Sequence, residues 1–342
     1  MDDSSSMATS QNLNAQTACD IGPECPHERR DEAFQKRRNA ACFEKDIPLP
    51  KQHCNGDECL FPSKIANYSK ALPHDHLAQV DLDAYHAMLK ALATGDPKNF
   101  EVIPLGGTVK LSNPQAAYAF EMAGPDSHHL GMVAPPDFSS AWLAGEMAEL
   151  YWQALCRDVP FTEYDTNPLI QAAANDLTSF SDFRGPKINN KVTPQTLFRL
   201  GVPGDLRGPY ISQFLWKDIP SGATTLTQRY LTPVAGIDFM TEYAEWLNIQ
   251  NGLVPSKALQ YEAVPRYIHN GRSLGEYVHR DFSFQAVLNA CLILSGLGTN
   301  ALAQSNPYLH STTQVGFATF GSPHILDFVV RAARVSLEAA WF

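Results

Sequence analysis

The residues best suited to chemistry in this sequence are histidines and carboxylates that stand close together along the chain. Residues 279–281 read His-Arg-Asp, the triplet in which a kinase catalytic loop presents its base. Such a loop also needs an Asn five residues after the Asp, and Ala286 occupies that position. The chain has neither the Gly-rich loop nor the Asp-Phe-Gly motif of kinases, so chance explains the triplet best.

Glu276 and His279 have the spacing of one half of the ligand set in a di-iron helical bundle. Such a site needs a second pair of this kind and two further glutamates. The other Glu-x-x-His, Glu24 to His27, contains Pro26 and lies in a segment of loop composition. A solvated helix face therefore explains Glu276 better, although other glutamates are available at positions 146, 149, 242 and 245.

Two histidine pairs lie in expected loops beside proline and aspartate: His74 with His76, and His128 with His129. Either pair could bind a metal, but turn residues that hydrogen-bond the backbone are commoner. We interpret all four as structural loop residues.

Five of the seven cysteines lie within the first 59 residues, at positions 19, 25, 42, 54 and 59. The spacings Cys19-x5-Cys25 and Cys54-x4-Cys59, with His27 and His53 nearby, miss the x2 spacing of strong zinc motifs. Zinc remains an alternative to plain thiols or a disulfide in a mobile arm. The chain also has no P-loop or G-x-G-x-x-G, and the motifs considered above define no self-contained active site.

The elements that would carry these residues are mostly helices. Apolar spacing, capping residues and terminating Gly or Pro predict helices over 27–46, 81–94, 112–123, 137–158, 167–180, 194–200, 238–251, 271–295 and 323–342. Threonines favour extended backbone, so short strands are expected within 222–233.

The last helix is amphipathic and has no terminating residue at its end. Its charges, Asp327, Arg331, Arg334 and Glu338, fall on one stripe. Its apolar residues predict a buried face elsewhere, made of Leu326, Val330, Ala333, Leu337 and Trp341 and widened by Phe328, Val335 and Phe342.

The composition fits a globular protein of 342 residues, of which 44% are hydrophobic. A formal net charge of −10 argues against nucleic acid or an anionic membrane as the partner. The start, "MDDSSSMATSQ", has no apolar core of a secretory signal, and no apolar run is long enough to span a bilayer. We expect a cytoplasmic protein by default.

Longer stretches resemble the amino-terminal half of vanadium-dependent haloperoxidases, in their bromoperoxidase branch. Examples are "GPYISQFLW" and "GIDFMTEYAEWLNIQNG"; the collinear stretches are 64–89, 106–164, 208–216, 236–252, 267–298 and 313–342. The resemblance implies an all-α fold, a helical bundle of the vanadium haloperoxidase type, with at most one short β-hairpin. It also implies an oxidoreductase of the acid phosphatase/vanadium haloperoxidase superfamily, which uses vanadate and peroxide to oxidise halide to hypohalous acid.

In that family the last helix continues past the Trp-aromatic pair into Gln-Lys-Trp and a basic run. That Lys and an Arg, a later Pro-Ser-Gly-His segment, and a final Arg and His form the vanadate site. None of these follows Phe342. We therefore expect a disordered arm over 1–28. We expect 29–342 to be the amino-terminal helical portion of a haloperoxidase-like domain, with the carboxy-terminal vanadate-binding half absent.

The resemblance assigns no catalytic or metal-binding residue to this chain, and one halide-pocket candidate. Trp341 matches a position that can line the halide pocket, and packing in the bundle core is an equally good reading. Vanadate is the implied cofactor, but its ligands are missing. Calcium, which relatives can hold in the loop before the last helix, is doubtful because residues 300–314 offer no carboxylate.

These expectations leave two hypotheses. In the first, the chain is a truncated part of a haloperoxidase-like enzyme and is inactive alone. Its partner is the carboxy-terminal half or another copy, and the parent enzyme acts on halide and peroxide. In the second, it is a non-catalytic helical interaction protein derived from the same family. Neither hypothesis involves nucleic acid or a membrane.

Overall fold

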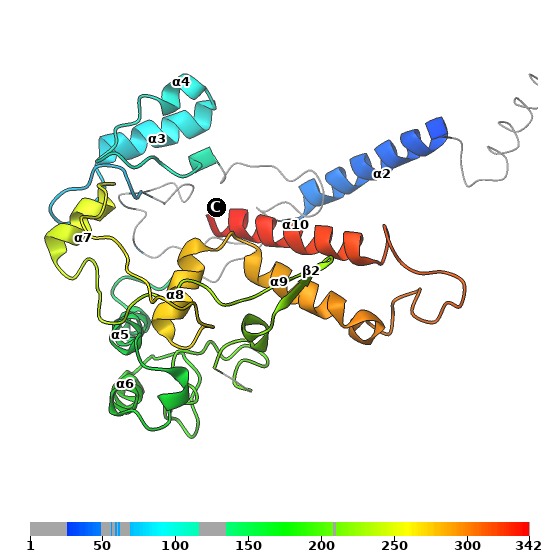
Figure 1. Ribbon diagram of the computed structural model, residues 1–342. Coiled ribbons are helices and arrows are strands. Elements are labelled where there is room, and N and C mark those ends of the chain that lie inside the picture. Colours follow the sequence, from blue (N-terminus) through cyan, green and yellow to red (C-terminus); the bar gives the residue numbers. More distant parts are fainter. Residues whose placement is uncertain are drawn as a thin grey trace, which may run out of the picture. The chain divides into compact units, whose positions relative to one another are not determined.

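The computed structural model describes residues 26–48, 56, 59, 61, 69–115, 135–207 and 210–341, with the side chain of Trp341 excepted. The chain divides into two compact units, Met1–Pro50 and Lys51–Phe342. Among the described residues, the secondary structure is helical except for one two-stranded hairpin. The expected all-α class with at most one short hairpin is confirmed (Figure 1).

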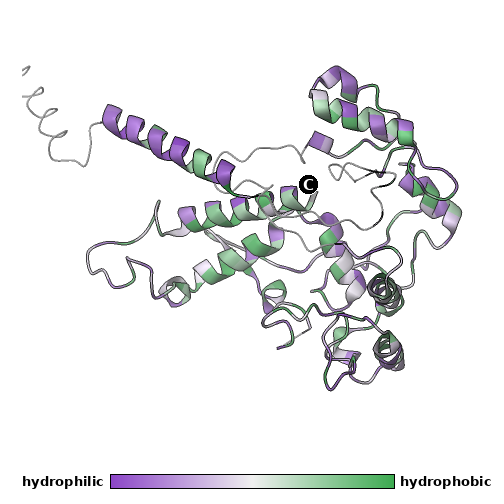
Figure 2. Ribbon diagram, turned by 180° about the vertical axis from the view of Figure 1, so that it is seen from behind, coloured by the Kyte–Doolittle hydropathy of each residue, from purple (hydrophilic) through white to green (hydrophobic). Residues whose placement is uncertain are grey.

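The first unit contributes one described helix, α2 (Pro26–Asp46), close to the expected 27–46. None of its residues is buried. Figure 2 shows the helix as almost entirely hydrophilic. Its stability must come from local interactions such as the ion pair between Lys36 and Glu32, which are four residues apart.

The second unit begins with a small helical core around α3 (Leu82–Thr94) and α4 (Pro97–Phe100). Asp81 caps α3 by accepting the N–H of Ala84 at 2.8 Å, and Gly95 ends it in the left-handed conformation. Tyr85 and Met88 are buried between the two helices and the preceding turn. The expected bounds of this helix are confirmed. The helix expected over 112–123 lies mainly outside the described residues.

A second core forms around α5 (Ala141–Cys156) and α6 (Pro168–Ser179), which pack against each other. Ser140 caps α5 by accepting the N–H of Leu143, and Asn167 caps α6 by accepting the N–H of Leu169. The short η4 (Phe161–Glu163) lies between them. The ring of its Phe161 stacks on the ring of Tyr210, with centroids 4.7 Å apart. The helix expected over 194–200 is wrong: this segment is a turn, with Phe198 at a positive φ of 58°.

The hairpin pairs β1 (Ile219–Ser221) with β2 (Thr224–Leu226), antiparallel, just after η5 (Gln213–Trp216). Only β2 lies within the range in which strands were expected. Both η5 and β1 pack on α9 (Gln285–Gly296). The two-stranded hairpin is therefore anchored to the helical core through α9.

The remaining helices are α7 (Tyr243–Gln250), α8 (Gly271–Arg280), α9 and α10 (Ser322–Trp341), with the short η6 (Gly298–Ala301) after α9. The expected helix over 271–295 is two helices. Asp281, which follows α8, has an extended backbone (ψ 157°), and the rings of Phe282 and Phe284 pack edge to face in the turn before α9. Helical apolar spacing continues through this turn, so periodicity alone could not locate the break.

Helix α10 lies along α9 (Figure 1), and its packed side coincides only in part with the expected one. Val335, Glu338 and Ala339 are buried, whereas Leu326, Val330, Ala333 and Leu337 are only half-buried. The expected solvated stripe of charges is therefore wrong at Glu338. Apolar residues surround much of this helix, so spacing could not decide which side would pack.

Candidate functional site

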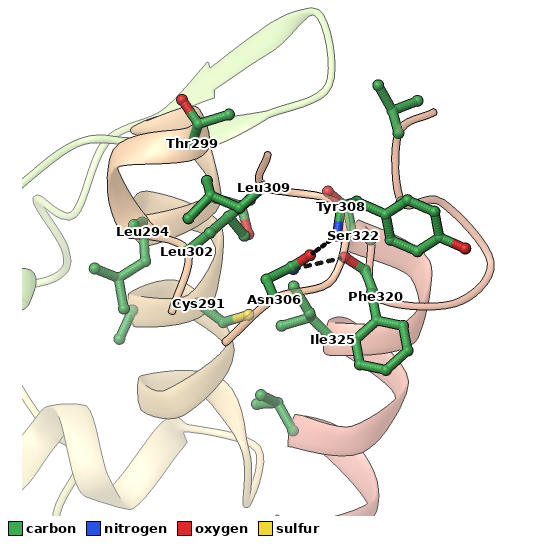
Figure 3. Close-up of a pocket in the computed structure, with 18 of the residues that line it drawn as sticks. Cys291, Leu294, Thr299, Leu302, Asn306, Tyr308, Leu309, Phe320, Ser322 and Ile325 are labelled. Carbon is green, nitrogen blue, oxygen red and sulfur yellow. Dashed lines mark hydrogen bonds between the residues drawn. The ribbon is translucent and has the colours of Figure 1, made fainter. Parts of the chain in front are cut away.

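One candidate site is a cavity of about 590 Å³ formed by α9, η6, the loop after it and the first turns of α10. Figure 3 shows Cys291 and Leu294 of α9 facing Ile325 of α10 across it. The lining is mainly apolar, and none of the lining residues is charged. A cavity of this size fits an organic group or protein side chains and offers no acid, base or cation.

Asn306 holds the wall of this cavity together. Its amide oxygen accepts the backbone N–H of Tyr308 at 2.9 Å, and its Nδ2 donates to the carbonyl of Phe320 at 3.3 Å (Figure 3). Sequence reasoning missed this role. An Asn before Pro307 inside a polar loop was the available signal, because Asn side chains commonly organise turns.

The most highly charged cluster among the described residues joins the end of α5 to the start of α8. Arg272 donates to Asp158 Oδ2 at 2.7 Å, to Asp238 Oδ1 at 2.8 Å and to the carbonyl of Ile237 at 2.7 Å. Arg157 pairs with the same Asp238. Sequence reasoning also missed this cluster, since its members are far apart in the chain.

The cluster shifts the acidity of both carboxyl groups. The hydrogen bond from Arg272 holds the pKa of Asp158 below its usual value, and those from Arg157 and Arg272 do the same for Asp238. The same partners raise the pKa of the Arg272 guanidinium. The pKa shifts of Asp158, Asp238 and Arg272 all favour their charged forms, as expected of a structural ion-pair network.

The Glu276–His279 pair does not form half of a metal site. Glu276 is buried, and its carboxylate accepts the Tyr261 hydroxyl at 2.7 Å and pairs with Arg280. His279 is exposed. Across the part of the chain that the structure describes, no three His, Cys, Asp or Glu residues gather as metal ligands. The interpretation of Glu276 as part of a solvated face is corrected, because it is a buried partner of Tyr261 and Arg280.

His74 has a structural setting. Its Nδ1 lies 2.7 Å from the carbonyl of Leu72 and its Nε2 lies 3.1 Å from the amide nitrogen of Gln250. The carbonyl of His76 accepts the Tyr243 hydroxyl at 2.9 Å. These contacts tie the turn before α3 to α7. His128 and His129 lie outside the described residues.

Of the cysteines, Cys42 and Cys59 are exposed free thiols, and Cys156 and Cys291 are buried free thiols. Burial raises the pKa of Cys156 to about 11, so this thiol is a poor nucleophile. Cys19, Cys25 and Cys54 lie outside the described residues, and so does His53. The zinc alternative therefore stays untested.

The described residues do not fit a vanadate site. An oxyanion of this kind needs several converging cationic donors and an imidazole. Several described arginines already donate to carboxylates: the largely buried Arg272 to Asp158 and Asp238, and the more exposed Arg280 to Glu276. On α10, Arg331 and Arg334 pair with Asp327 and Glu338. Trp341 is the last residue of α10, and its side chain is not among those described.

The loop over 300–314 does not fit calcium either. Calcium takes six to eight oxygen ligands, usually with carboxylates among them. The loop has no carboxylate, and the side-chain oxygen of Asn306 already accepts the N–H of Tyr308.

In the described residues, no helix is both long and apolar enough to cross a membrane.

Comparisons with known proteins find sequence similarity to bromoperoxidases. No protein-family profile matches it. It is 32% identical over 335 residues to a vanadium-dependent bromoperoxidase of Ascophyllum nodosum, which covers 94% of the chain and 59% of that protein. It is 29% identical over 387 residues to the vanadium-dependent bromoperoxidase of Corallina pilulifera, covering 91% of the chain and 64% of that protein.

The fold agrees with these similarities. The second vanadate-dependent bromoperoxidase (AnII) of Ascophyllum nodosum, a homohexamer, superposes with a TM-score of 0.83 at 30% identity, over 94% of the chain and 55% of that protein's chain. The chain thus spans a little over half the length of the proteins it matches. This coverage does not support the narrower expectation that the matched part is the amino-terminal half. The chain is similar in sequence to vanadium-dependent bromoperoxidases over 91–94% of its length and shares the helical fold of the AnII enzyme.

Proposed function

We propose that this chain supplies the helical scaffold of a vanadium-dependent haloperoxidase, an enzyme that oxidises halide with peroxide. The observation that carries the proposal is the match to the AnII bromoperoxidase over 94% of the chain, at 30% identity and a TM-score of 0.83. Agreement in sequence and fold over the same span supports common descent and a common kind of chemistry. Bromide is the first halide to test, because the relatives are bromoperoxidases.

The vanadate ligands are proposed to lie outside these 342 residues. The support is twofold. The sequence contains no Ser-Gly-His. Arg272, the arginine of the Asp158–Asp238 cluster, and Arg280 are paired with carboxylates instead of converging on an open cradle. Under this proposal Trp341 lines the halide pocket only when the ligand-bearing segment is present, and calcium has no role in the loop over 300–314.

The test is a pair of measurements on purified, metal-defined protein. Equilibrium dialysis with orthovanadate should show no saturable binding to the 342-residue chain, and peroxide-dependent bromination of a dye should stay at the buffer rate. A chimera that joins this chain to the unmatched remainder of the Ascophyllum nodosum enzyme should do both. Bromination by the chain alone would overturn the assignment of the ligands. A folded chimera that binds vanadate without brominating would overturn the proposed function.

We also propose that the chain self-associates. The support is the homohexameric assembly of the AnII bromoperoxidase, on which the chain superposes. The cavity between α9 and α10 adds an uncharged surface on which such association could occur.

A further inference from the structure

The cavity between α9 and α10 is a preformed hole in the surface. Asn306 ties the loop before α10 to the carbonyl of Phe320, and Phe320 donates its backbone N–H to His324 Nδ1 at 3.0 Å. The rings of Phe320, His324 and Phe328 then follow one another edge to face along α10, with centroids 5.9 and 4.6 Å apart. These contacts hold the wall open where an apolar lining would otherwise collapse.

An apolar projection stands at the rim of the same hole. Val315 is 86% exposed and lines the rim, and Phe317, two residues on, is 71% exposed. The turn that carries them is tight, because a Cβ on Gly316 or Gly321 would lie 2.5 Å from backbone atoms of the opposite arm. Phe317 N donates to the Thr319 carbonyl at 3.1 Å and closes the turn. The two side chains are therefore held out in water by a stiff support.

A hole and a projection side by side are what a two-fold interface between identical chains requires. In such an interface one patch faces itself, so each copy must offer both parts. The chain carries a formal net charge of −10, which makes copies repel each other over most of their surfaces. The lining of this hole has no charged residue, so contact here avoids that repulsion.

We propose that a second copy of this chain docks on this face, with Phe317 of each copy inserted into the cavity of the other and Val315 packed at the rim. The proposal rests on the self-association proposed above and names its surface. An aromatic side chain is well suited to this role, because it buries a large apolar area at low conformational cost.

The experiment is sedimentation equilibrium of the 342-residue chain and four single variants. Phe317→Ser and Val315→Ser should each raise the dimer dissociation constant by about tenfold or more, because each change occurs twice in a two-fold contact. Leu200→Ser, at a residue that is also 86% exposed, and Phe138→Ser, at one that is 60% exposed, should leave the constant unchanged. All four positions are exposed, so equal urea midpoints will show that the fold is intact.

A second readout follows the cavity itself. Cys291 lines it and is 8% exposed, whereas Cys59 is exposed elsewhere. Alkylation of Cys291 by N-ethylmaleimide, measured by peptide mass spectrometry, should slow as protein concentration passes the dissociation constant. Alkylation of Cys59 should not change, and Phe317→Ser should abolish the concentration dependence.

The outcomes separate the two proposals. Association that Phe317→Ser and Val315→Ser leave unchanged would overturn this surface while self-association stands. A chain that stays monomeric at all concentrations would overturn both.

Discussion

At the scale of single residues, the arginine–aspartate cluster links parts of unit two that are distant in sequence. Arg272 and Asp158 are 114 residues apart, and their contact fixes the start of α8 against the end of α5. The Arg272 side chain is 12% exposed, while those of Asp158 and Asp238 are each 33% exposed. Water therefore screens the acids in part, and the arginine is the member whose loss matters most.

Arg272→Met should lower the free energy of unfolding by about 2 kcal/mol, because it leaves the half-buried Asp158 without its main partner and Asp238 with Arg157 alone. The matched control is Arg331→Met. Arg331 pairs with Asp327 on the open face of α10, with side chains 44% and 55% exposed, and its loss should cost under about 0.5 kcal/mol. Urea unfolding of both variants checks this. Equal losses would show that the cluster is no stronger than a surface pair.

The same cluster predicts a dependence on pH. A carboxyl group whose pKa is lowered in the folded state contributes stability above its unfolded pKa of about 3.9 and loses it as the pH falls through the folded value. Asp158 and Asp238 both have lowered pKa values. The advantage of the wild type over Asp158→Asn should therefore be full at pH 7 and shrink below about pH 4. An advantage that stays constant down to pH 2 would contradict it.

At the scale of elements, the end of α7 is clamped to the segment that follows α4. The carbonyl of Gly252 accepts the N–H groups of Thr108 and Val109 at 3.1 and 3.0 Å. Gly107 lies so close that a Cβ there would be 2.5 Å from the carbonyl carbon and oxygen of Gly252. Gly275, inside α8, has no atom within 4 Å of the position of a Cβ.

This difference predicts opposite effects for the same substitution. Gly107→Ala should destabilise unit two by roughly 1–3 kcal/mol, because backbone must move to admit the methyl group. Gly275→Ala should raise stability by about 0.5–1 kcal/mol, since alanine is the better helix former in open space. Thermal and urea unfolding measure both. A neutral Gly107→Ala would mean that the clamp is loose.

At the scale of the whole molecule, the division into two units has a thermodynamic consequence. None of the residues of α2 is buried, so its loss removes no buried side chain that the structure describes. We expect a chain of residues 51–342 to have the same free energy of unfolding in urea as the full chain, within about 0.5 kcal/mol. A clearly lower midpoint would show that residues 1–50 contribute to the core of unit two. The division at residue 28 expected from the sequence stays a prediction.

Local chemistry in the sequence was enough to predict much of the helical framework. Asp81, Ser140 and Asn167 each begin a helix, because a cap needs only the backbone of the next turn. Residues 222–233 likewise revealed one strand of the hairpin. The resemblance to haloperoxidases rested on longer stretches and is supported by homologues over 91–94% of the chain.

What the tertiary structure decided is which of these elements meet. Arg272 finds Asp158 across 114 residues, Glu338 turns inward on α10, and the helix expected over 271–295 breaks at Asp281. The cavity between α9 and α10 likewise exists because Asn306 reaches the backbone of Phe320. Caps and periodicity depend on neighbours within one or two turns, so the sequence alone determined them. Burial and ion pairing depend on surfaces brought together from distant parts of the chain, so only the folded structure could settle them.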